Sequence, residues 1–168
     1  MFNVGDLVIY SVHGLCEIDD IREKSYGKVT RNYYVMHPLE NPKLTISNPV
    51  DSDQVVMKAV MEKDEATELM NSFQSPGIRW IEDARERTKQ YNKVVNTGDR
   101  KEISKVVNTL MKTSLEAIRN QQKMNTQDRD LLTNTQNIMF MELAMSLDTS
   151  FDDINQKVNS MISLQEQE

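Results

Sequence analysis

The spacing of hydrophobic residues changes near residue 62, and this change divides the chain into two parts. In the first part, short runs of valine, isoleucine and tyrosine alternate with glycine and proline, which is typical of antiparallel strands. Strands are predicted at residues 7–10, 15–22, 31–36 and 44–46, with a fifth beginning at Val55. Short strands at this spacing favour a small, curved antiparallel β-barrel.

From residue 63 onward, apolar residues recur with a helical period. This pattern predicts helices over residues 64–73, 78–96, about 100–122 and 151–164, and another that is capped by Asn125 or Thr126 and includes Ala144. Asp99 and Ser150 are the expected N-caps of two of them. The predicted fold class is therefore α+β, with a barrel domain over residues 1–62 and an all-α domain over residues 63–168.

Length and composition point to a cytoplasmic protein. The 168 residues suffice for one domain or two small ones, and 38% of them are hydrophobic. No apolar run approaches the roughly 18 residues of a membrane span, and the first ten residues lack the pattern of a signal peptide. Cys16 is the single cysteine, so no internal disulfide is expected.

Charge is distributed unevenly along the chain. The formal net charge is −6, which argues against strong nonspecific binding of nucleic acid. Residues 1–62 carry net −3, residues 63–123 net +3 and residues 124–168 net −6. Screening limits electric fields to about 8–10 Å at ordinary salt, so a local surplus matters more than the total. Residues 63–123 are therefore the part of the chain whose charge favours the binding of anions such as phosphates.

Motifs for catalysis or cofactor binding are missing from the sequence. Neither a G-x-G-x-x-G motif nor a P-loop is present. His13 and Cys16 lie close together, but they lack the paired spacing of zinc ligands. A turn histidine and a small buried thiol are the preferred interpretation. We expect no metal, no cofactor and no enzymatic activity. An enzyme is the least favoured hypothesis, and tight binding of a metal or nucleotide would support it.

Trp80 is the only tryptophan, and it has two interpretations. Cations lie around it, and an indole at a helix start could stack on bases while the cations hold phosphates. Alternatively, Trp80 packs inside the protein, which is the interpretation that the residues alone favour. The eleven methionines fall mostly on apolar helical positions, which favours core packing over a binding surface. The cations near Trp80 are Arg79, Arg85, Arg87, Lys89 and Lys93.

Residues 2–14 have the form F-x-V-G-D-x-V-x-Y-x-x-H-G, which resembles the opening signature of the CarD/CdnL family. The resemblance continues through Tyr33-Tyr34-Val35, Ile46, Pro49 and Trp80 to Glu142-Leu143-Ala144, and so covers residues 2–147. A similar Tudor-like domain occurs in the transcription-repair coupling factor, a much longer helicase. The helical second half found here points to the CarD type.

This resemblance implies a function. Members of the family bind the RNA polymerase β subunit through the Tudor-like barrel. Their helical domain contacts promoter DNA at the upstream edge of the melted bubble, where a tryptophan wedges into the minor groove. The open complex is stabilised and no reaction is catalysed. We therefore expect a monomer whose partners are the β subunit and promoter DNA, the latter bound weakly by the free protein.

Site residues follow from the same resemblance. Trp80 matches the wedge, and Arg85 matches a basic position after it. Lys24 matches a barrel cation that faces the polymerase. An exposed strand around Leu44, Thr45 and Ile46 matches the segment that adds to a β-subunit strand. The expected DNA-contacting residues are Trp80, Arg79, Arg85, Arg87 and Lys89.

The chain departs from the family pattern at three positions. Ser47 replaces a common arginine, Asp83 stands where a DNA-facing cation is expected, and Ser11 replaces a common proline. Each should weaken binding modestly, because a surface charge contributes about 1 kcal/mol or less. Asp83, its neighbour Glu82 and the negative total charge favour an alternative, a protein–protein adaptor that does not touch DNA. The acidic residues 148–168 lie beyond the resemblance.

Overall fold

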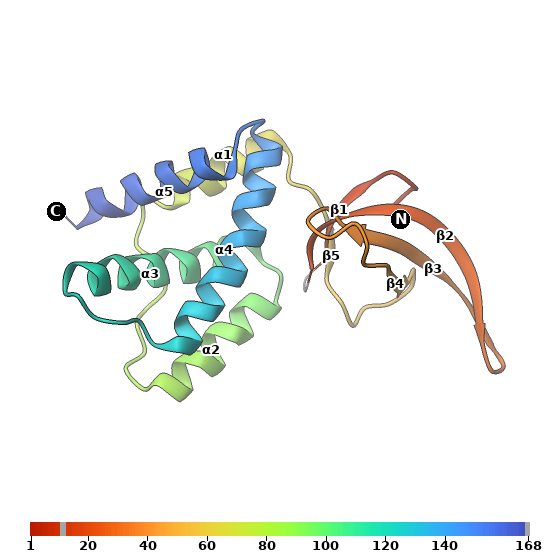
Figure 1. The fold of residues 1–168 in the computed structure, drawn as a ribbon, viewed down its shortest axis with the longest axis horizontal. Helices are drawn as coiled ribbons and strands as arrows, with labels where there is room; N and C mark the ends of the chain where they lie inside the picture. The colour runs from red at the N-terminus through yellow and green to blue at the C-terminus, as the bar shows by residue number, and fades with distance from the viewer. Residues whose placement is uncertain (11–12, 167–168) are drawn as a thin grey trace. The chain divides into compact units, whose positions relative to one another are not determined.

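The computed structural model of the chain describes residues 1–10 and 13–166 and confirms the α+β class (Figure 1). Ser11 lies outside the described residues. The chain forms two compact units, Met1–Val60 and Met61–Glu168. Within the described part of the chain, none of the helices has the length and apolar character needed to cross a membrane.

The N-terminal unit is a five-stranded antiparallel sheet rather than the predicted closed barrel. Its strands are β1 Leu7–Tyr10, β2 Gly14–Tyr26, β3 Val29–Pro38, β4 Ile46–Pro49 and β5 Met57–Ala59, in the order β4-β3-β2-β1-β5. A barrel requires hydrogen bonds between its two edge strands. In the described residues, β4 pairs with β3 and β5 pairs with β1, so the sheet stays open.

The β2–β3 hairpin is longer than the hydrophobic pattern predicts. Pairing continues out to Tyr26 opposite Val29, and both side chains are exposed. The two-residue turn between them has Gly27 at φ +64°, a conformation that favours glycine. Residues 23–25 are polar and lack an apolar face, which is why the pattern stopped at Arg22. The core of the sheet is formed by Val8, Tyr10, Cys16, Ile18, Tyr34 and Met36.

The fourth strand is shifted from its predicted position. It was expected at residues 44–46, but β4 begins at Ile46, and Leu44 and Thr45 precede it. The Leu44 amide donates to the Asn41 carbonyl at 3.1 Å, so the turn that contains Pro42 extends through Leu44. This local hydrogen bond keeps Leu44 out of the β-ladder.

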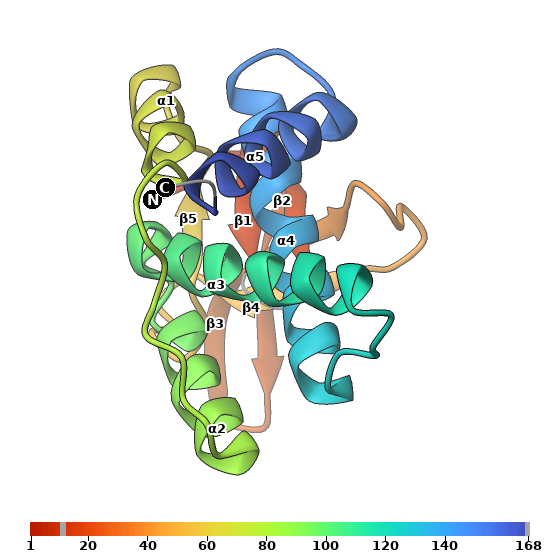
Figure 2. The same cartoon turned by 90° about the vertical axis from the view of Figure 1, so that its left-hand side faces the viewer.

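The C-terminal unit contains five helices, α1 Lys63–Ser72, α2 Ala84–Asn96, α3 Arg100–Arg119, α4 Thr126–Ser146 and α5 Phe151–Gln165. Helix α3 contacts each of the other four, as Figure 2 shows. The predicted caps are confirmed: the side chains of Asp99, Asn125 and Ser150 accept backbone N–H groups of α3, α4 and α5, respectively. These bonds satisfy donors that the helix itself leaves without partners.

Helix α5 belongs to the core of this unit although it lies beyond the resemblance at residues 2–147. Its Ile154, Val158 and Ile162 are completely buried. They pack in one cluster with Phe73 of the α1 C-terminus and Phe140 of α4. The acidic C-terminal segment therefore has a structural role. Several methionines of the other helices are also buried, as their helical positions predicted.

A buried carboxylate fixes the first residue of the helical unit. Glu142 of α4 accepts a hydrogen bond from the Met61 amide at 2.9 Å and forms an ion pair with Arg100 at 2.6 Å. The Ser146 hydroxyl donates to the Met61 carbonyl at 2.7 Å. Burial raises the pKa of Glu142 above its ordinary value, although the Arg100 guanidinium opposes this effect. Both backbone groups of Met61 are thus held by α4.

Candidate nucleic-acid interface

Trp80 lies on an extended segment between α1 and α2, which we call the Trp80 segment (residues 75–83). The predicted helix over residues 78–96 was therefore wrong in its first turns. Helix α2 begins at Ala84 because the Asp83 side chain accepts the Glu86 amide at 2.8 Å as an N-cap. Asp83 stands where a cation was expected, and in this chain it ends the extended segment and starts the helix.

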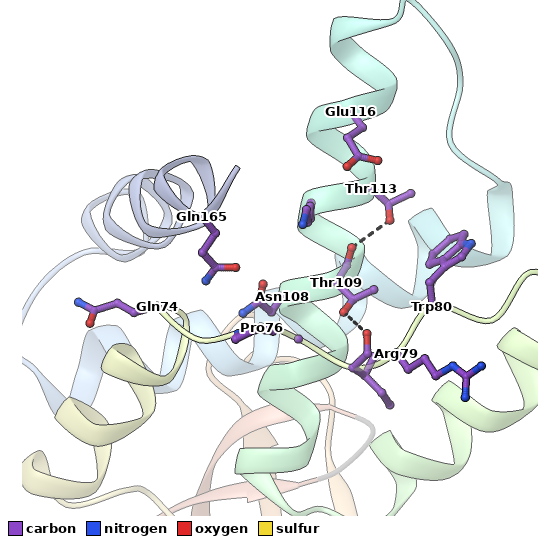
Figure 3. Close-up of a pocket in the computed structure, with 12 residues that line it drawn as sticks. Gln74, Pro76, Arg79, Trp80, Asn108, Thr109, Thr113, Glu116 and Gln165 are labelled. Carbon is purple, nitrogen blue, oxygen red and sulfur yellow. Dashed lines mark hydrogen bonds between the residues drawn. The ribbon is translucent and has the colours of Figure 1, made fainter. Parts of the chain in front are cut away.

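Helix α3 holds the first half of the Trp80 segment. The Ile78 amide donates to the Lys105 carbonyl at 3.0 Å, and the Thr109 hydroxyl donates to the Ile78 carbonyl at 2.7 Å. The Asn108 amide group donates to the Ser75 carbonyl at 2.8 Å. Figure 3 shows Thr109 in contact with the segment. These bonds satisfy the backbone of a segment that has no regular secondary structure.

Gly77 allows the segment to lie directly on α3. A β-carbon at this position would come within 2.7 Å of the Lys105 carbonyl oxygen and 2.9 Å of the Thr109 amide nitrogen. Both distances are shorter than any normal contact, and both atoms belong to the helix backbone. Only glycine therefore fits at residue 77 without moving the segment.

Helix α2 holds the peptide groups on both sides of Trp80. The hydroxyl of the buried Tyr91 donates to the Arg79 carbonyl at 2.8 Å. Nη1 of Arg87 donates to the Ile81 carbonyl at 2.8 Å. Arg87 and Tyr91 are four residues apart and share one face of the helix. The backbone on each side of the indole is thus fixed by the same helical face.

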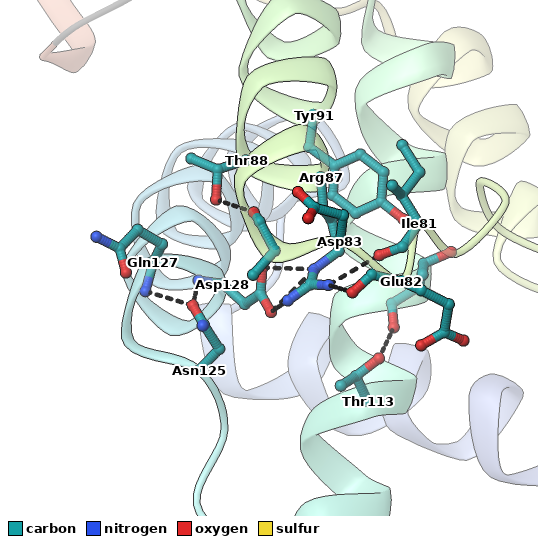
Figure 4. Close-up of polar contacts among 12 residues, drawn as sticks. Ile81, Glu82, Asp83, Arg87, Thr88, Tyr91, Thr113, Asn125, Gln127 and Asp128 are labelled. Atoms are coloured by element: carbon teal, nitrogen blue, oxygen red, sulfur yellow. Dashed lines mark hydrogen bonds and ion pairs between the residues drawn. The ribbon is translucent and has the colours of Figure 1, made fainter.

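Arg87, which was predicted to contact DNA, is buried instead. It is 5% exposed, and its Nε and Nη2 atoms donate to the Asp128 carboxylate of α4 at 2.7–3.1 Å (Figure 4). The hydrogen bond with Asp128 raises the pKa of the guanidinium above its ordinary value. The guanidinium carbon lies 4.1 Å from the centre of the Trp80 ring. This cation is already paired with Asp128 and covered by protein, so it is not available to bind a phosphate.

The other predicted cations are accessible. Arg79, Arg85 and Lys89 are exposed, and Trp80 is half-buried. A groove of about 710 Å³ is lined by Arg79 and Trp80, and a further cation, Lys112 of α3, also lines it. Sequence reasoning missed Lys112 because its position depends on how the Trp80 segment packs on α3. The groove is lined by Gln74, Pro76, Gly77, Ile78, Arg79, Trp80, Asn108, Thr109, Lys112, Thr113, Glu116 and Gln165.

Acidic side chains are interspersed among these cations. Glu82, Asp83 and Glu86 are all exposed. Glu86 accepts a hydrogen bond from Gln90 one turn later at 2.7 Å, and Asp83 is occupied as a cap. Neither bond removes a charge, because both donors are neutral, so all three carboxylates would oppose an approaching phosphate.

The predicted polymerase-facing residues lie on β2 and near β4. Lys24 donates to the Ser47 hydroxyl at 2.8 Å and lies 5.7 Å from the centre of the Tyr33 ring. Leu44 and Thr45 are exposed, and Ile46 is half-buried at the start of β4. In the described ladders, β4 pairs with β3 alone, and no described strand pairs with its other edge.

His13 and Cys16 do not form a metal site. His13 is exposed and stacks on Tyr10 with ring centres 5.9 Å apart, whereas Cys16 is buried. Burial raises the pKa of the Cys16 thiol to about 11. Over residues 1–10 and 13–166, no cluster of three or more His, Cys, Asp or Glu side chains could hold a metal ion.

Comparisons with known proteins match both halves of the chain. A family model described as the CarD-like/TRCF RID domain matches residues 2–61, and one described as the CarD C-terminal domain matches residues 68–159. The chain is also similar to "Putative transcription factor YdeB" of Bacillus subtilis. The two are 24% identical over 149 residues, which cover 85% of this chain and 90% of the relative. The order and extent of the two matched domains show that the chain belongs to the CarD/CdnL family.

Proposed function

We propose that this chain regulates transcription by binding the RNA polymerase β subunit and stabilising the open promoter complex. Its N-terminal unit binds the polymerase, and its helical unit contacts DNA at the upstream edge of the bubble. Membership of the CarD/CdnL family supports this role, as does the similarity to a protein named as a transcription factor. No catalytic step is part of the proposal.

The observation that carries the DNA contact is the presentation of Trp80. The indole is half-buried on a segment held by α2 and α3, and the neighbouring Arg79, Arg85 and Lys89 are exposed. Cations of this kind bind phosphates, and an aromatic side chain stacks on bases. A side chain held in place before binding loses little conformational entropy when it binds.

A wedge favours the open complex selectively. Unstacking a base step in an intact duplex costs a few kcal/mol. At the edge of a bubble the polymerase has already separated the strands, so an indole binds there without that cost. Because a ligand shifts an equilibrium only by its difference in affinity for the two states, Trp80 would stabilise the open state over the closed one.

The open edge of β4 supports the polymerase contact. A strand of the β subunit could extend the sheet there through backbone hydrogen bonds. Lys24 and Ser47 are joined by a hydrogen bond, which ties the cation on β2 to the edge strand. Ser47 offers a hydroxyl in place of the family's arginine, so we expect weaker charge pairing at this position.

Exposed acids favour a second candidate, an adaptor that binds the polymerase or another protein without touching DNA. Glu82 and Glu86 lie between the cations of the proposed interface and would repel phosphates. The adaptor predicts that Trp80 is dispensable for the lifetime of open complexes. The DNA-contacting regulator predicts the opposite.

Both hypotheses can be tested with the full-length chain. We expect it to bind the purified β-subunit lobe and to lengthen the lifetime of open complexes at a promoter. Lys24→Ala should weaken β binding, whereas Trp80→Ala should leave β binding intact and abolish the lifetime effect. If the chain fails to bind the lobe, the polymerase assignment is wrong. If it binds the lobe and Trp80→Ala retains the full lifetime effect, the adaptor becomes the better hypothesis.

A further inference from the structure

One face of the Trp80 ring is covered by a cation of the protein itself. The guanidinium carbon of Arg87 lies 4.1 Å from the centre of the indole. A cation at this distance over an aromatic face is attracted by the ring quadrupole. At most one face of the indole and its edges are therefore left for another molecule.

The orientation of Arg87 is fixed by hydrogen bonds at all three of its nitrogen atoms. Nε and Nη2 donate to Asp128, which is 3% exposed. Nη1 donates to the carbonyls of Ile81 and Glu82 at 2.8 and 3.3 Å. A planar guanidinium bonded in this way within its own plane has only its faces free for stacking. Figure 4 shows it between Asp128 and the two carbonyls.

We propose that Arg87 is a positioning residue for Trp80 and that Asp128 holds Arg87 in place. Arg87 stacks on the indole and donates to the carbonyls of the next two residues, so one side chain contacts both the ring and the backbone that follows it. Because Asp128 lies in the first turns of α4, the orientation of Trp80 is coupled to a helix 41 residues further along the chain. The consequence for DNA rests on the proposed function, but the positioning of the ring does not.

A merely structural ion pair is the competing explanation. Removing one partner of a buried pair leaves the other uncompensated, so Arg87→Met alone would unfold part of the unit for reasons unrelated to Trp80. Replacing both partners by apolar residues of similar size often preserves the fold. The double variant Arg87→Met with Asp128→Leu therefore removes the stacked cation without leaving a buried charge. Arg87→Lys keeps the charge and loses the planar fork.

Trp80 reports on its own surroundings because it is the only tryptophan in the chain. In the double variant we expect its emission maximum and its acrylamide quenching constant to change, since the fixed planar cation over one ring face is replaced by a flexible neutral side chain. Arg87→Lys should behave like the double variant. Arg85→Met removes an exposed cation two residues earlier on α2 and should leave the emission unchanged. Circular dichroism and thermal unfolding identify variants that have lost the fold.

The proposal is overturned if the folded double variant retains the emission and quenching of the parent chain. A forked promoter DNA separates this result from the proposed function. We expect the double variant to bind the forked DNA about five- to tenfold more weakly. A loss of this size corresponds to part of the energy with which one base stacks on an aromatic side chain. If its emission changes as expected while Trp80→Ala binds the fork like the parent, the positioning stands and the DNA role fails. If its emission is unchanged and Trp80→Ala loses the fork, the DNA role stands and the positioning fails.

Discussion

Gly77 packs so closely on Thr109 that a β-carbon at residue 77 would lie 2.3 Å from the threonine hydroxyl oxygen. Gly77→Ala should therefore push the Trp80 segment away from α3. We expect a loss of about 1–3 kcal/mol in the free energy of unfolding, which is typical of overpacking. Urea unfolding followed by circular dichroism measures this loss, and the Trp80 emission should shift in the same variant.

A second substitution identifies which atoms cause the clash. Thr109→Ala removes the hydroxyl but leaves the Lys105 carbonyl 2.7 Å and the Thr109 amide 2.9 Å from the added carbon. Combining it with Gly77→Ala should thus fail to restore stability. Full recovery in the double variant would mean that the side chain alone limits the approach.

Trp80→Ala should have a moderate effect on stability and a large effect on function. Deleting a fully buried aromatic side chain costs about 3–5 kcal/mol, and Trp80 is only half-buried. We expect a loss of about 1–2 kcal/mol, with the helical unit still folded at room temperature. Trp80→Phe keeps an aromatic plane and should retain part of the effect on open complexes. A loss as large as that of a buried aromatic would indicate a purely structural tryptophan.

Glu142 gives the helical unit a specific dependence on pH. Its pKa is raised by burial, so the folded chain binds this proton more readily than the unfolded chain does. The contribution of Glu142 to the free energy of unfolding is therefore largest near or below the ordinary glutamate pKa. It is lost as the pH rises through the higher pKa of the folded chain. Relative to Glu142→Gln, the parent should gain stability in urea unfolding as the pH is lowered from neutral to the ordinary glutamate pKa. A constant difference over that whole range would contradict the raised pKa.

Cys16 should be unreactive in the folded chain. It is fully buried, and a pKa raised from 9.0 to about 11 leaves about a hundredfold less thiolate at neutral pH. Alkylation by iodoacetamide at pH 8 should be at least about a hundredfold slower in buffer than in denaturing urea. Equal rates in the two conditions would mean that the N-terminal sheet opens readily in solution.

The sequence predicted what depends on local pattern and missed what depends on packing. The caps at Asp99, Asn125 and Ser150 were found because a side-chain acceptor before a helix acts over three residues. The start of α2 was misplaced because the apolar residues before Asp83 continue the helical period, although hydrogen bonds from α2 and α3 hold this segment out of the helix. The strand β4 was misplaced for a similar reason, since the turn at Pro42 extends further than its composition indicates.

The set of site residues shows the same limit. Arg79, Arg85 and Lys89 are exposed as expected for DNA contacts, but whether they touch DNA stays a prediction. Arg87 could not be distinguished from them in the sequence, because its partner Asp128 is 41 residues away.

Under the proposed function, the fixed backbone of Met61 has a consequence for how strongly the helical unit would need to bind DNA. Val60 alone separates Ala59, the last residue of β5, from Met61, whose amide and carbonyl are both bonded to α4. A tether this short keeps the helical unit at an effective concentration on the order of millimolar around a polymerase-bound sheet. A dissociation constant in the millimolar range for DNA would then suffice. Such weak binding would be compatible with a net charge of −6, which disfavours strong nonspecific binding of nucleic acid.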